Sequence, residues 1–265
     1  MLVKKKSEAT FILITTITIL LPTFYVLFMI SKAGELLNFD YWWMIKNIYS
    51  IDGFSTNIFD WIFRANEHFV LIPAIIYALN IVVTKGSNIG LCLATFFLAC
   101  VQGILLITLV PNTLKKYRPI LFLLMLFISV FNFTPAAAHN WMRGYSGVHW
   151  VIANLFVIAS IFCVKKSLEF QQNRFAIASI ILGILGCISY STALGVWPIL
   201  FGVSILYKLP KKFTISYLFF SILVIGTYFL TYTTPSHHPS LSKLNFIDIV
   251  AYIPVYLGAI FTHDI

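Results

Sequence analysis

Charged residues are scarce in this sequence. Only 10% of the 265 residues are Asp, Glu, Lys or Arg, whereas 60% are hydrophobic and the mean hydropathy is +0.91. A soluble domain has about 25% charged residues, because its surface must be hydrated. The composition therefore excludes a soluble globular protein and a disordered one, and it indicates a polytopic membrane protein.

Acidic residues are the scarcer charged class. Nine Asp and Glu stand against 18 Lys and Arg, which gives a net charge of +9. In a membrane protein the excess of basic residues is expected in loops that stay in the cytoplasm. We therefore use the basic residues as a guide to topology and expect no nucleic-acid partner.

Motifs for metals, disulfides and nucleotides are missing. Cys92, Cys100, Cys163 and Cys187 lie singly in apolar runs with no CxxC spacing, so we expect buried packing rather than a disulfide framework or a zinc site. Neither GxxxxGK[ST] nor GxGxxG occurs, which argues against a nucleotide-sugar donor.

Long charge-free runs dominate what is present. A spanning helix needs ~20 apolar residues to cross ~30 Å of hydrocarbon, because every backbone amide must be paired within the segment. The runs are 11–31, 69–84, 86–114, 119–142, 144–164, 175–207, 213–232 and 249–262. They predict an all-α, polytopic transmembrane helical bundle with about eight or nine membrane segments. We expect one transmembrane domain over 1–265, with a first span at 11–31, an outer loop at 32–68 and the remaining spans in 69–262.

Basic loops predict the orientation. Lysines at 4–6 precede the first run, which we interpret as a retained signal anchor with a cytoplasmic N-terminus. The loops at 165–174 and 208–212 should lie on the same side, so 175–207 must cross an even number of times. That run is too short for two full spans, and we expect a hairpin of two short helices with its turn between Ser189 and Gly195.

Two further basic sites conflict. Lys85 and the cluster at 115–118 both look cytoplasmic, yet the apolar run between them suits a single crossing. Either one loop departs from the positive-inside rule, or 69–84 does not fully span the membrane.

The predicted outer loop, 32–68, holds most of the acidic residues. They are Glu35, Asp40, Asp52, Asp60 and Glu67. Two aromatic, amphipathic stretches at 41–49 and 54–63 flank a turn at Asp52-Gly53. Such stretches are typical of helices in the membrane interface.

Several polar groups should meet at the outer face. Ionisable groups at span ends that face a cavity are functional candidates by default. The candidates are Asp40, Asn66, Glu67, His68, Asn140, Arg143, His149 and Tyr190. For the tryptophans nearby, we favour an ordinary interfacial belt.

Structural alternatives exist for the charged candidates. Asp40 can cap a helix that starts at Tyr41, or it can act in chemistry. Glu67 with His68 can hold a proton, a metal ion or a sugar hydroxyl, or can form a solvated helix start. Arg143 suits bidentate binding of phosphate but can also extend to the lipid headgroups.

This pattern resembles the GT-C superfamily of integral-membrane glycosyltransferases. It combines a signal anchor, an acid soon after it in a long outer loop, and many short spans. Within that superfamily, three stretches resemble a large group of mostly uncharacterised bacterial sugar transferases. They are Asn66-Glu67-His68 with Pro73, Phe133-Thr134-Pro135 with Asn140-Trp141 and Gly144, and Ser189-Tyr190-Ser191 with Gly195, Trp197 and Pro198. Roughly residues 10 to 210 are covered.

The resemblance implies sugar transfer from a polyprenyl-phosphate donor to an acceptor hydroxyl at the outer, periplasmic face of the inner membrane. Asp40 would be the general base. Glu67 and His68 would orient the acceptor or hold a divalent cation, and Arg143 would bind the carrier phosphate. Asn66, Asn140, His149 and Tyr190 would bind substrate. The expected partners are the lipid-linked donor, membrane lipid, and an acceptor glycan, lipid or protein.

Two departures separate the chain from that group. Phe69 follows Glu67-His68 where the group usually has a basic residue, and GT-C enzymes are longer, so we expect a C-terminally truncated chain. The alternatives are a multi-span transporter or flippase, or a non-catalytic membrane component of envelope glycan assembly. Against a transporter, no internal repeat is visible and the acids lie in an outer loop.

Overall fold

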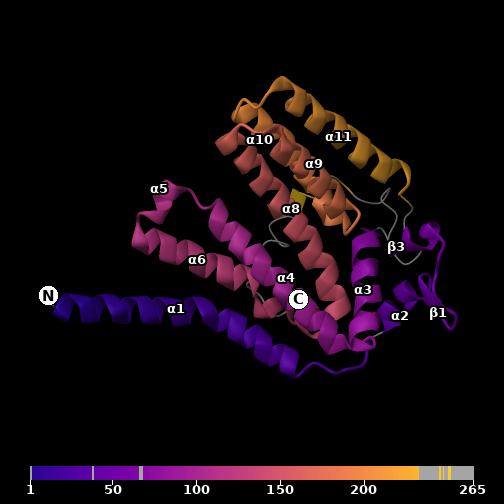
Figure 1. The fold of residues 1–265 in the computed structure, drawn as a ribbon, viewed down its shortest axis with the longest axis horizontal. Coiled ribbons are helices and arrows are strands. Elements are labelled where there is room, and N and C mark those ends of the chain that lie inside the picture. The colour runs from indigo at the N-terminus through magenta and orange to yellow at the C-terminus, as the bar shows by residue number, and fades with distance from the viewer. Residues whose placement is uncertain are drawn as a thin grey trace.

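The chain is mostly helical, as its composition predicts. The computed structural model describes residues 2–37, 39–65, 68–232, 245, 247, 250 and 251, with the side chains of 2–12, 14, 39 and 40 left out. The helices, shown in Figure 1, are α1 (Leu2–Ser31), α2 (Phe39–Ile45), α3 (Leu71–Thr84), α4 (Asn88–Leu109), α5 (Asn112–Lys115), α6 (Arg118–Asn132), α7 (Ala138–Met142), α8 (Gly144–Phe170), α9 (Asn173–Cys187), α10 (Val196–Leu206) and α11 (Lys211–Leu230). Short elements complete the described part: the 3-10 helices η1 (Ile58–Trp61), η2 (Pro135–Ala137) and η3 (Ser191–Gly195), and the strands β1 (Tyr49–Ser50), β2 (Gly53–Phe54), β3 (Arg64–Ala65) and β4 (His68–Phe69).

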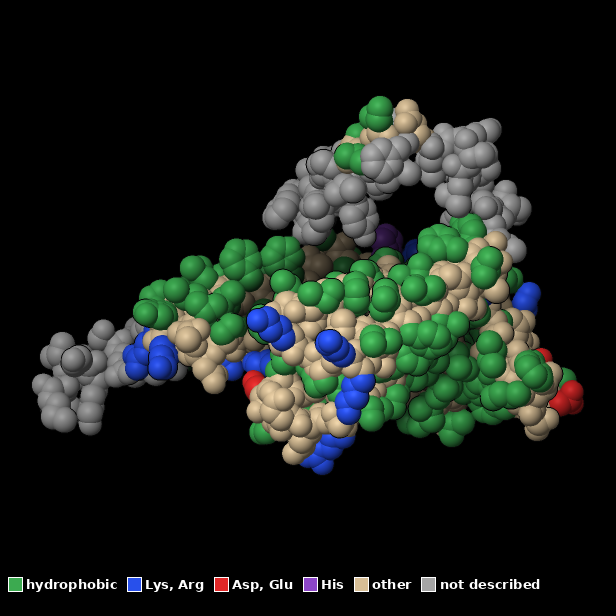
Figure 2. Space-filling view, turned by 90° about the horizontal axis from the view of Figure 1, so that it is seen from above, with side chains coloured by type: hydrophobic (Ala, Val, Ile, Leu, Met, Phe, Trp, Pro, Cys, Tyr) green, Lys and Arg blue, Asp and Glu red, His purple; other side chains and the backbone are tan. Residues whose placement is uncertain are grey.

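Apolar helices give the molecule the character of a membrane protein. Within the described residues, four helices are long and apolar enough to cross a membrane, and four further apolar helices are shorter. The long ones are Asn88–Leu109, Arg118–Met142, Gly144–Phe170 and Lys211–Leu230, where Arg118–Met142 takes α6, η2 and α7 together. The shorter ones are Thr15–Ser31, which is part of α1, Leu71–Thr84, Asn173–Cys187, and Ser191–Leu206, which takes η3 and α10 together. Figure 2 shows hydrophobic side chains over much of one face, with Lys and Arg gathered at one side of it.

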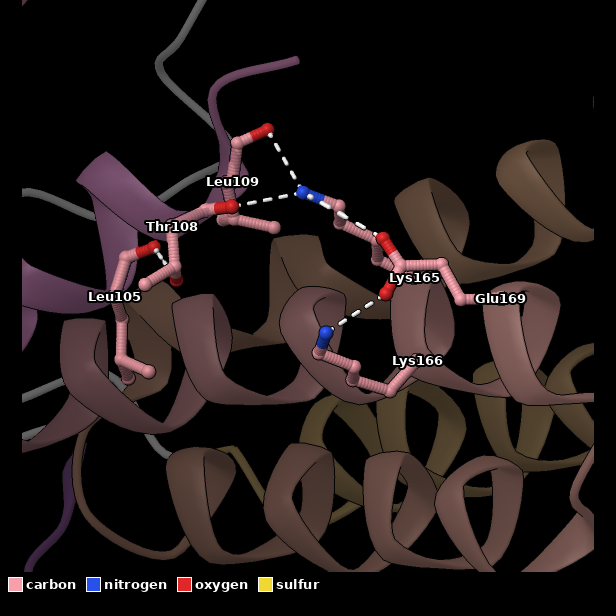
Figure 3. A network of polar contacts seen from close by, with 6 residues as sticks. All are labelled: Leu105, Thr108, Leu109, Lys165, Lys166 and Glu169. Carbon is pink, nitrogen blue, oxygen red and sulfur yellow. Dashed lines mark hydrogen bonds and ion pairs between the residues drawn. The ribbon is translucent and has the colours of Figure 1, made fainter. Parts of the chain in front are cut away.

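Helices α4 and α8 form a parallel pair at the centre of the bundle. Where both begin, the Asn88 side-chain amide donates to the Met142 carbonyl at 2.9 Å, and its oxygen accepts from the Gly144 backbone N–H at 3.0 Å. Where both end, Lys165 Nζ donates to the Thr108 carbonyl at 2.7 Å (Figure 3). The lysine thus pairs with a carbonyl that the last turn of α4 leaves unpaired.

Glycines bring α4 and α8 into close contact at their starts. A Cβ at Gly144 would lie 2.4 Å from Leu91 Cβ, and one at Gly147 would lie 2.7 Å from Thr95 Cγ2. Both glycines are buried. Small residues at such a crossing let two backbones approach, which is how apolar helices pack without a hydrophobic driving force between them.

The predicted hairpin in 175–207 is confirmed as a pair of short helices. Helix α9 ends at Cys187, and η3 leads directly into α10 at Val196. Trp197 is fully buried between the two arms, with Nε1 3.2 Å from the Cys187 sulfur. The turn falls at 188–190, at the start of the predicted interval, and the Ile188 carbonyl accepts from the Leu71 backbone N–H at 3.0 Å.

The structure places the two conflicting basic sites at opposite ends of α4. Helix α3 has 14 residues, about 21 Å at 1.5 Å per residue. It starts beside the hairpin turn at Ile188 and ends just before α4 begins. Lys85 therefore lies at the start of α4 and the cluster at 115–118 beyond its end. The two sites cannot share one side of a membrane that α4 crosses.

The first loop is only partly as predicted. Helix α2 confirms the first aromatic stretch, 41–49, only as far as Ile45, because Tyr49 is already in β1. Gly53, with φ +102°, confirms the turn, which joins β1 to β2. The second stretch, 54–63, was predicted as an amphipathic helix and this is wrong: it forms only the 3-10 turn η1. Asn57 Oδ1 accepts from the Phe59 backbone N–H at 3.1 Å, and its amide donates to Asp60 at 3.1 Å. These local bonds favour a turn over a continued helix.

Replacing Gly144 by Ala should destabilise the protein, because the added Cβ would also lie 2.5 Å from the Cys92 backbone N. Overpacking of this kind costs about 1–3 kcal/mol. Gly202→Ala is the matched control, since a Cβ there meets no heavy atom within 4 Å. Thermal unfolding of both variants in detergent measures the effect, and a Gly144→Ala protein as stable as wild type would contradict the close approach.

Candidate functional site

Aromatic and imidazole rings gather beside the start of α8. We define the ring cluster as His68, Tyr77, His149, Trp150 and Tyr190. Strand β4 supplies His68, α3 supplies Tyr77, α8 supplies the next two, and the turn before η3 supplies Tyr190. Three parts of the chain that are far apart in the sequence, 68–77, 149–150 and 190, therefore meet at one place.

Tyr190 is the centre of the ring cluster. Its ring stacks on His68 with centroids 3.7 Å apart and on His149 with centroids 5.8 Å apart. Trp150 lies 4.8 Å from it in a tilted arrangement. A tyrosine held on three sides by rings has a fixed orientation, because each contact restricts its rotation.

Hydrogen bonds fix both imidazoles. His68 Nδ1 pairs with the Ser191 hydroxyl. The Tyr77 hydroxyl donates to the Tyr145 carbonyl at 2.8 Å and also pairs with His149 Nε2. Because a hydroxyl has a single proton, this arrangement assigns the donor role to His149 Nε2–H. His149 is only 8% exposed, so its tautomer is set by the protein.

Helix α2 packs against this cluster through one residue. Tyr41 is buried, and its ring meets Tyr77 edge-on with centroids 5.3 Å apart. Its hydroxyl has no hydrogen-bond partner among the described residues. Burial raises the pKa of Tyr41 to about 12, so the phenol stays neutral at physiological pH. The backbone of Asp40 is thereby held next to the ring cluster.

Three of the predicted site residues come together, namely His68, His149 and Tyr190. Asn66 and Glu67 lie outside the described residues. Asp40 lies in the first turn of α2, which begins one residue earlier, at Phe39; its side chain lies outside the described part. The predicted cap role assumed a helix that starts at Tyr41, two residues after the observed start at Phe39. Asp40 is therefore inside the helix, where a carboxylate in the first turn would act through the helix dipole.

Asn140 and Arg143 lie in the segment that leads into α8. The Asn140 side-chain oxygen accepts from the Ser146 hydroxyl at 2.8 Å, and Arg143 is exposed at the residue before α8. Asn140 therefore has a structural partner in the first turn of α8. Nearby Trp141 is buried, with Nε1 2.9 Å from the Thr134 carbonyl, whereas Trp42 is 58% exposed and suits an interfacial belt.

Tyr77 is the functional candidate that sequence reasoning missed. It lies in the apolar run 69–84 with nothing polar beside it in sequence. The available signal was chemical, since a buried tyrosine hydroxyl needs a partner. Its partner, His149, is 72 residues away in the chain, which local patterns do not reveal.

No group of three or more His, Cys, Asp and Glu residues in the described part of the chain is arranged to hold a metal ion. The predicted cation ligands were Glu67 and His68. Of these, His68 uses Nδ1 for Ser191, and Glu67 is outside the described residues. Cys92 and Cys187 are buried free thiols, as their apolar surroundings predict.

The ring cluster has the side-chain types that recognise small polar molecules. Stacked rings offer apolar faces, while imidazoles and hydroxyls supply a few oriented polar groups at their edges, which is the usual composition of a small-molecule site. Comparisons of the chain with family models, with curated proteins and with solved structures find no match. Function must therefore be argued from these residues.

Tyr77→Phe should lower the stability of the protein, because it leaves the Tyr145 carbonyl and His149 Nε2 without the hydroxyl that pairs with both. A buried polar group left unpaired costs about 1–3 kcal/mol. Tyr207→Phe is the control, since Tyr207 is 65% exposed. Thermal unfolding compares the two, and equal stabilities would show that the hydroxyl network does not hold α3 to α8.

Proposed function

We propose that this chain transfers a sugar from a polyprenyl-phosphate donor to an acceptor hydroxyl at the outer face of the inner membrane. The observation that carries the proposal is the ring cluster, in which His68 of the first loop meets His149 and Tyr190 beside α2. The resemblance to GT-C glycosyltransferases, which gives those segments the same role, supports it.

The proposal includes eight or nine membrane segments and a cytoplasmic N-terminus. Four long and four shorter apolar helices account for eight, and the run 249–262 is the candidate ninth. In this arrangement α3 enters the membrane without crossing it. The basic ends of α8 and the loop before α11 face the cytoplasm, and the ring cluster faces outward.

The residues then have distinct chemical roles. The Asp40 carboxylate accepts the proton of the acceptor hydroxyl as that oxygen forms its bond to the donor sugar carbon. The bond from this carbon to the phosphate oxygen breaks, so configuration inverts and the polyprenyl phosphate leaves with its charge. Glu67 and His68 orient the acceptor. His149 and Tyr190, with Asn66 and Asn140, bind the sugar, and Arg143 stabilises the departing phosphate.

The aromatic character of the site suits a sugar. A pyranose ring presents an apolar face of C–H groups and a rim of hydroxyls, a combination that sites rich in aromatic and imidazole side chains recognise. A transporter site would instead centre on broken helices near the membrane midplane. The ring cluster lies where α8 begins, close to a helix end.

Cysteine labelling tests the orientation. In a variant with the four native cysteines replaced, Thr56→Cys and His139→Cys should react with an impermeant reagent in intact cells. Thr113→Cys and Asn173→Cys should react only after the inner face is opened. All four positions are exposed, so reactivity reports sidedness. The reverse pattern would place the ring cluster on the cytoplasmic side and refute the proposed reaction site.

Asp40→Asn tests the chemistry. Loss of a positioned general base lowers the rate ~10²–10⁴-fold, whereas the amide retains most of the helix-start interaction. The assay follows consumption of polyprenyl-phosphate sugars by the full chain in lipid nanodiscs. Asp52→Asn is the matched control, an exposed acid in the same loop. A folded Asp40→Asn protein that transfers at the wild-type rate would remove Asp40 from the mechanism.

A further inference from the structure

The guanidinium of Arg64 has a buried N–H donor at Nη1. The guanidinium lies 4.3 Å from the centroid of the Phe69 ring and 5.4 Å from that of Tyr228. Nη2 donates to the Thr231 hydroxyl. Nη1 is buried and has no hydrogen-bond partner among the described residues. A buried donor left unpaired is costly, and more so when it carries charge.

The rings that hold Arg64 also line an apolar cavity. We call this cavity the apolar groove: it has a volume of about 260 Å³ and is lined by Ile62, Phe69, Leu71, Cys187, Ile188, Leu194, Leu223 and Tyr228, among others. It lies between the first loop, the start of α3, the end of α9 and the last turns of α11. The guanidinium is therefore fixed at the rim of an apolar space.

The charge of Arg64 is not neutralised within the described part of the chain. The ion pairs described there join Lys165 and Lys166 to Glu169, at the other end of α8. Arg64 instead lies on two aromatic faces, which contact the flat face of the guanidinium and not the edge from which it donates hydrogen bonds. A cation beside an apolar cavity selects a ligand with an anionic head and a hydrocarbon chain.

We propose that Arg64 and the apolar groove bind the phosphate and the first part of the chain of a lipid phosphate. The guanidinium fork matches two phosphate oxygens, and Nη1 gains the partner it lacks. The chain enters the groove and continues into the bilayer along α11, a helix long enough to cross it. A polyprenyl phosphate and a bilayer phospholipid share this chemistry.

The groove adjoins the ring cluster through shared neighbours. Phe69 of the groove follows His68 in the chain, and Ile188 precedes Tyr190 by two residues. A lipid phosphate at Arg64 would thus carry its attached sugar toward the ring cluster. This assignment of the donor rests on the proposed function, and it gives Arg64, in place of Arg143, the role of holding the carrier phosphate. The lipid site itself requires no transfer activity.

Binding can be measured by native mass spectrometry of the full chain released from detergent micelles. The probes are a polyprenyl phosphate, the uncharged polyprenol of the same length, phosphatidylglycerol and inorganic phosphate. Arg64→Gln should weaken binding of the polyprenyl phosphate roughly 10- to 100-fold, the value of a hydrogen bond to a charged group, and leave polyprenol binding unchanged. Leu223→Trp, which fills the groove, should weaken both.

Arg174→Gln is the matched control. Its guanidinium also lies over an aromatic ring, 5.1 Å from the Phe175 centroid, but it follows the far end of α8 and does not share its aromatic contact with the apolar groove. Its affinity for each probe should equal that of wild type. Arg64→Lys keeps the charge without the fork and should bind with intermediate affinity, and a thermal unfolding curve for each variant verifies that it is folded.

The outcomes distinguish a polyprenyl phosphate from a bilayer phospholipid as the ligand, and failure of the lipid site from failure of the proposed function. Tighter, Arg64-dependent binding of the polyprenyl phosphate supports the donor assignment, and equal Arg64-dependent binding of phosphatidylglycerol supports a phospholipid site. Inorganic phosphate that binds as tightly as the lipids, with no effect of Leu223→Trp, would overturn the groove. Unchanged binding in Arg64→Gln would overturn the site. If binding is Arg64-dependent but no sugar is transferred, the proposed function fails and the lipid site stands.

Discussion

The close parallel contact of α4 with α8 is the constraint on which the rest of the structure depends. At its start, Asn88 joins the two helices through both atoms of its amide, and Gly144 has no side chain that would separate them. At its end Lys165 joins them again. With both ends fixed, α8 cannot slide along α4 without breaking hydrogen bonds, and the bond from Gly144 to Asn88 is buried, where an unpaired polar group is expensive. The position of α8 in turn fixes the positions of His149 and Trp150, which lie in its second turn.

The ring cluster is built outward from this fixed turn. Tyr77 attaches α3 to it through the Tyr145 carbonyl and His149, and Tyr41 attaches α2 to Tyr77. The hairpin turn is attached twice, by the Leu71 N–H to the Ile188 carbonyl and by Tyr190 against His149. Each added segment therefore rests on one already positioned, and the first loop comes last, through His68 on Tyr190. Positioning of this kind lets a site use loop residues with the precision of helix residues.

Sequence patterns predicted the parts of this arrangement that depend on local composition. Apolar runs gave the helices, and Gly195 and Pro198 after a polar triplet gave the hairpin. The failures have different causes, some local and some in contacts between distant segments. The stretch 54–63 has helical amphipathicity but forms a turn, because Asn57 and Asp60 bond locally. Tyr77 could not be told from other aromatic residues in apolar runs, because the partner of its hydroxyl, His149, lies in another helix. The charge rule alone could not order Lys85 and the cluster at 115–118, because the positions of the two sites at opposite ends of α4 follow from the packing of α3 and α4.

The hairpin turn is the element that the two candidate sites share. Ile188 lines the apolar groove, and Tyr190, two residues later, is the centre of the ring cluster. Strand β4 is shared in the same way. Phe69 lines the groove and its ring contacts the Arg64 guanidinium, while adjacent His68 stacks on Tyr190. Successive side chains of an extended strand point to opposite faces, so β4 can present His68 to one site and Phe69 to the other. The apolar groove and the ring cluster are therefore neighbours twice, through Phe69 and His68 in β4 and through Ile188 and Tyr190 in the hairpin turn. A ligand in which a phosphate is bonded directly to a sugar ring would match two sites that lie this close together.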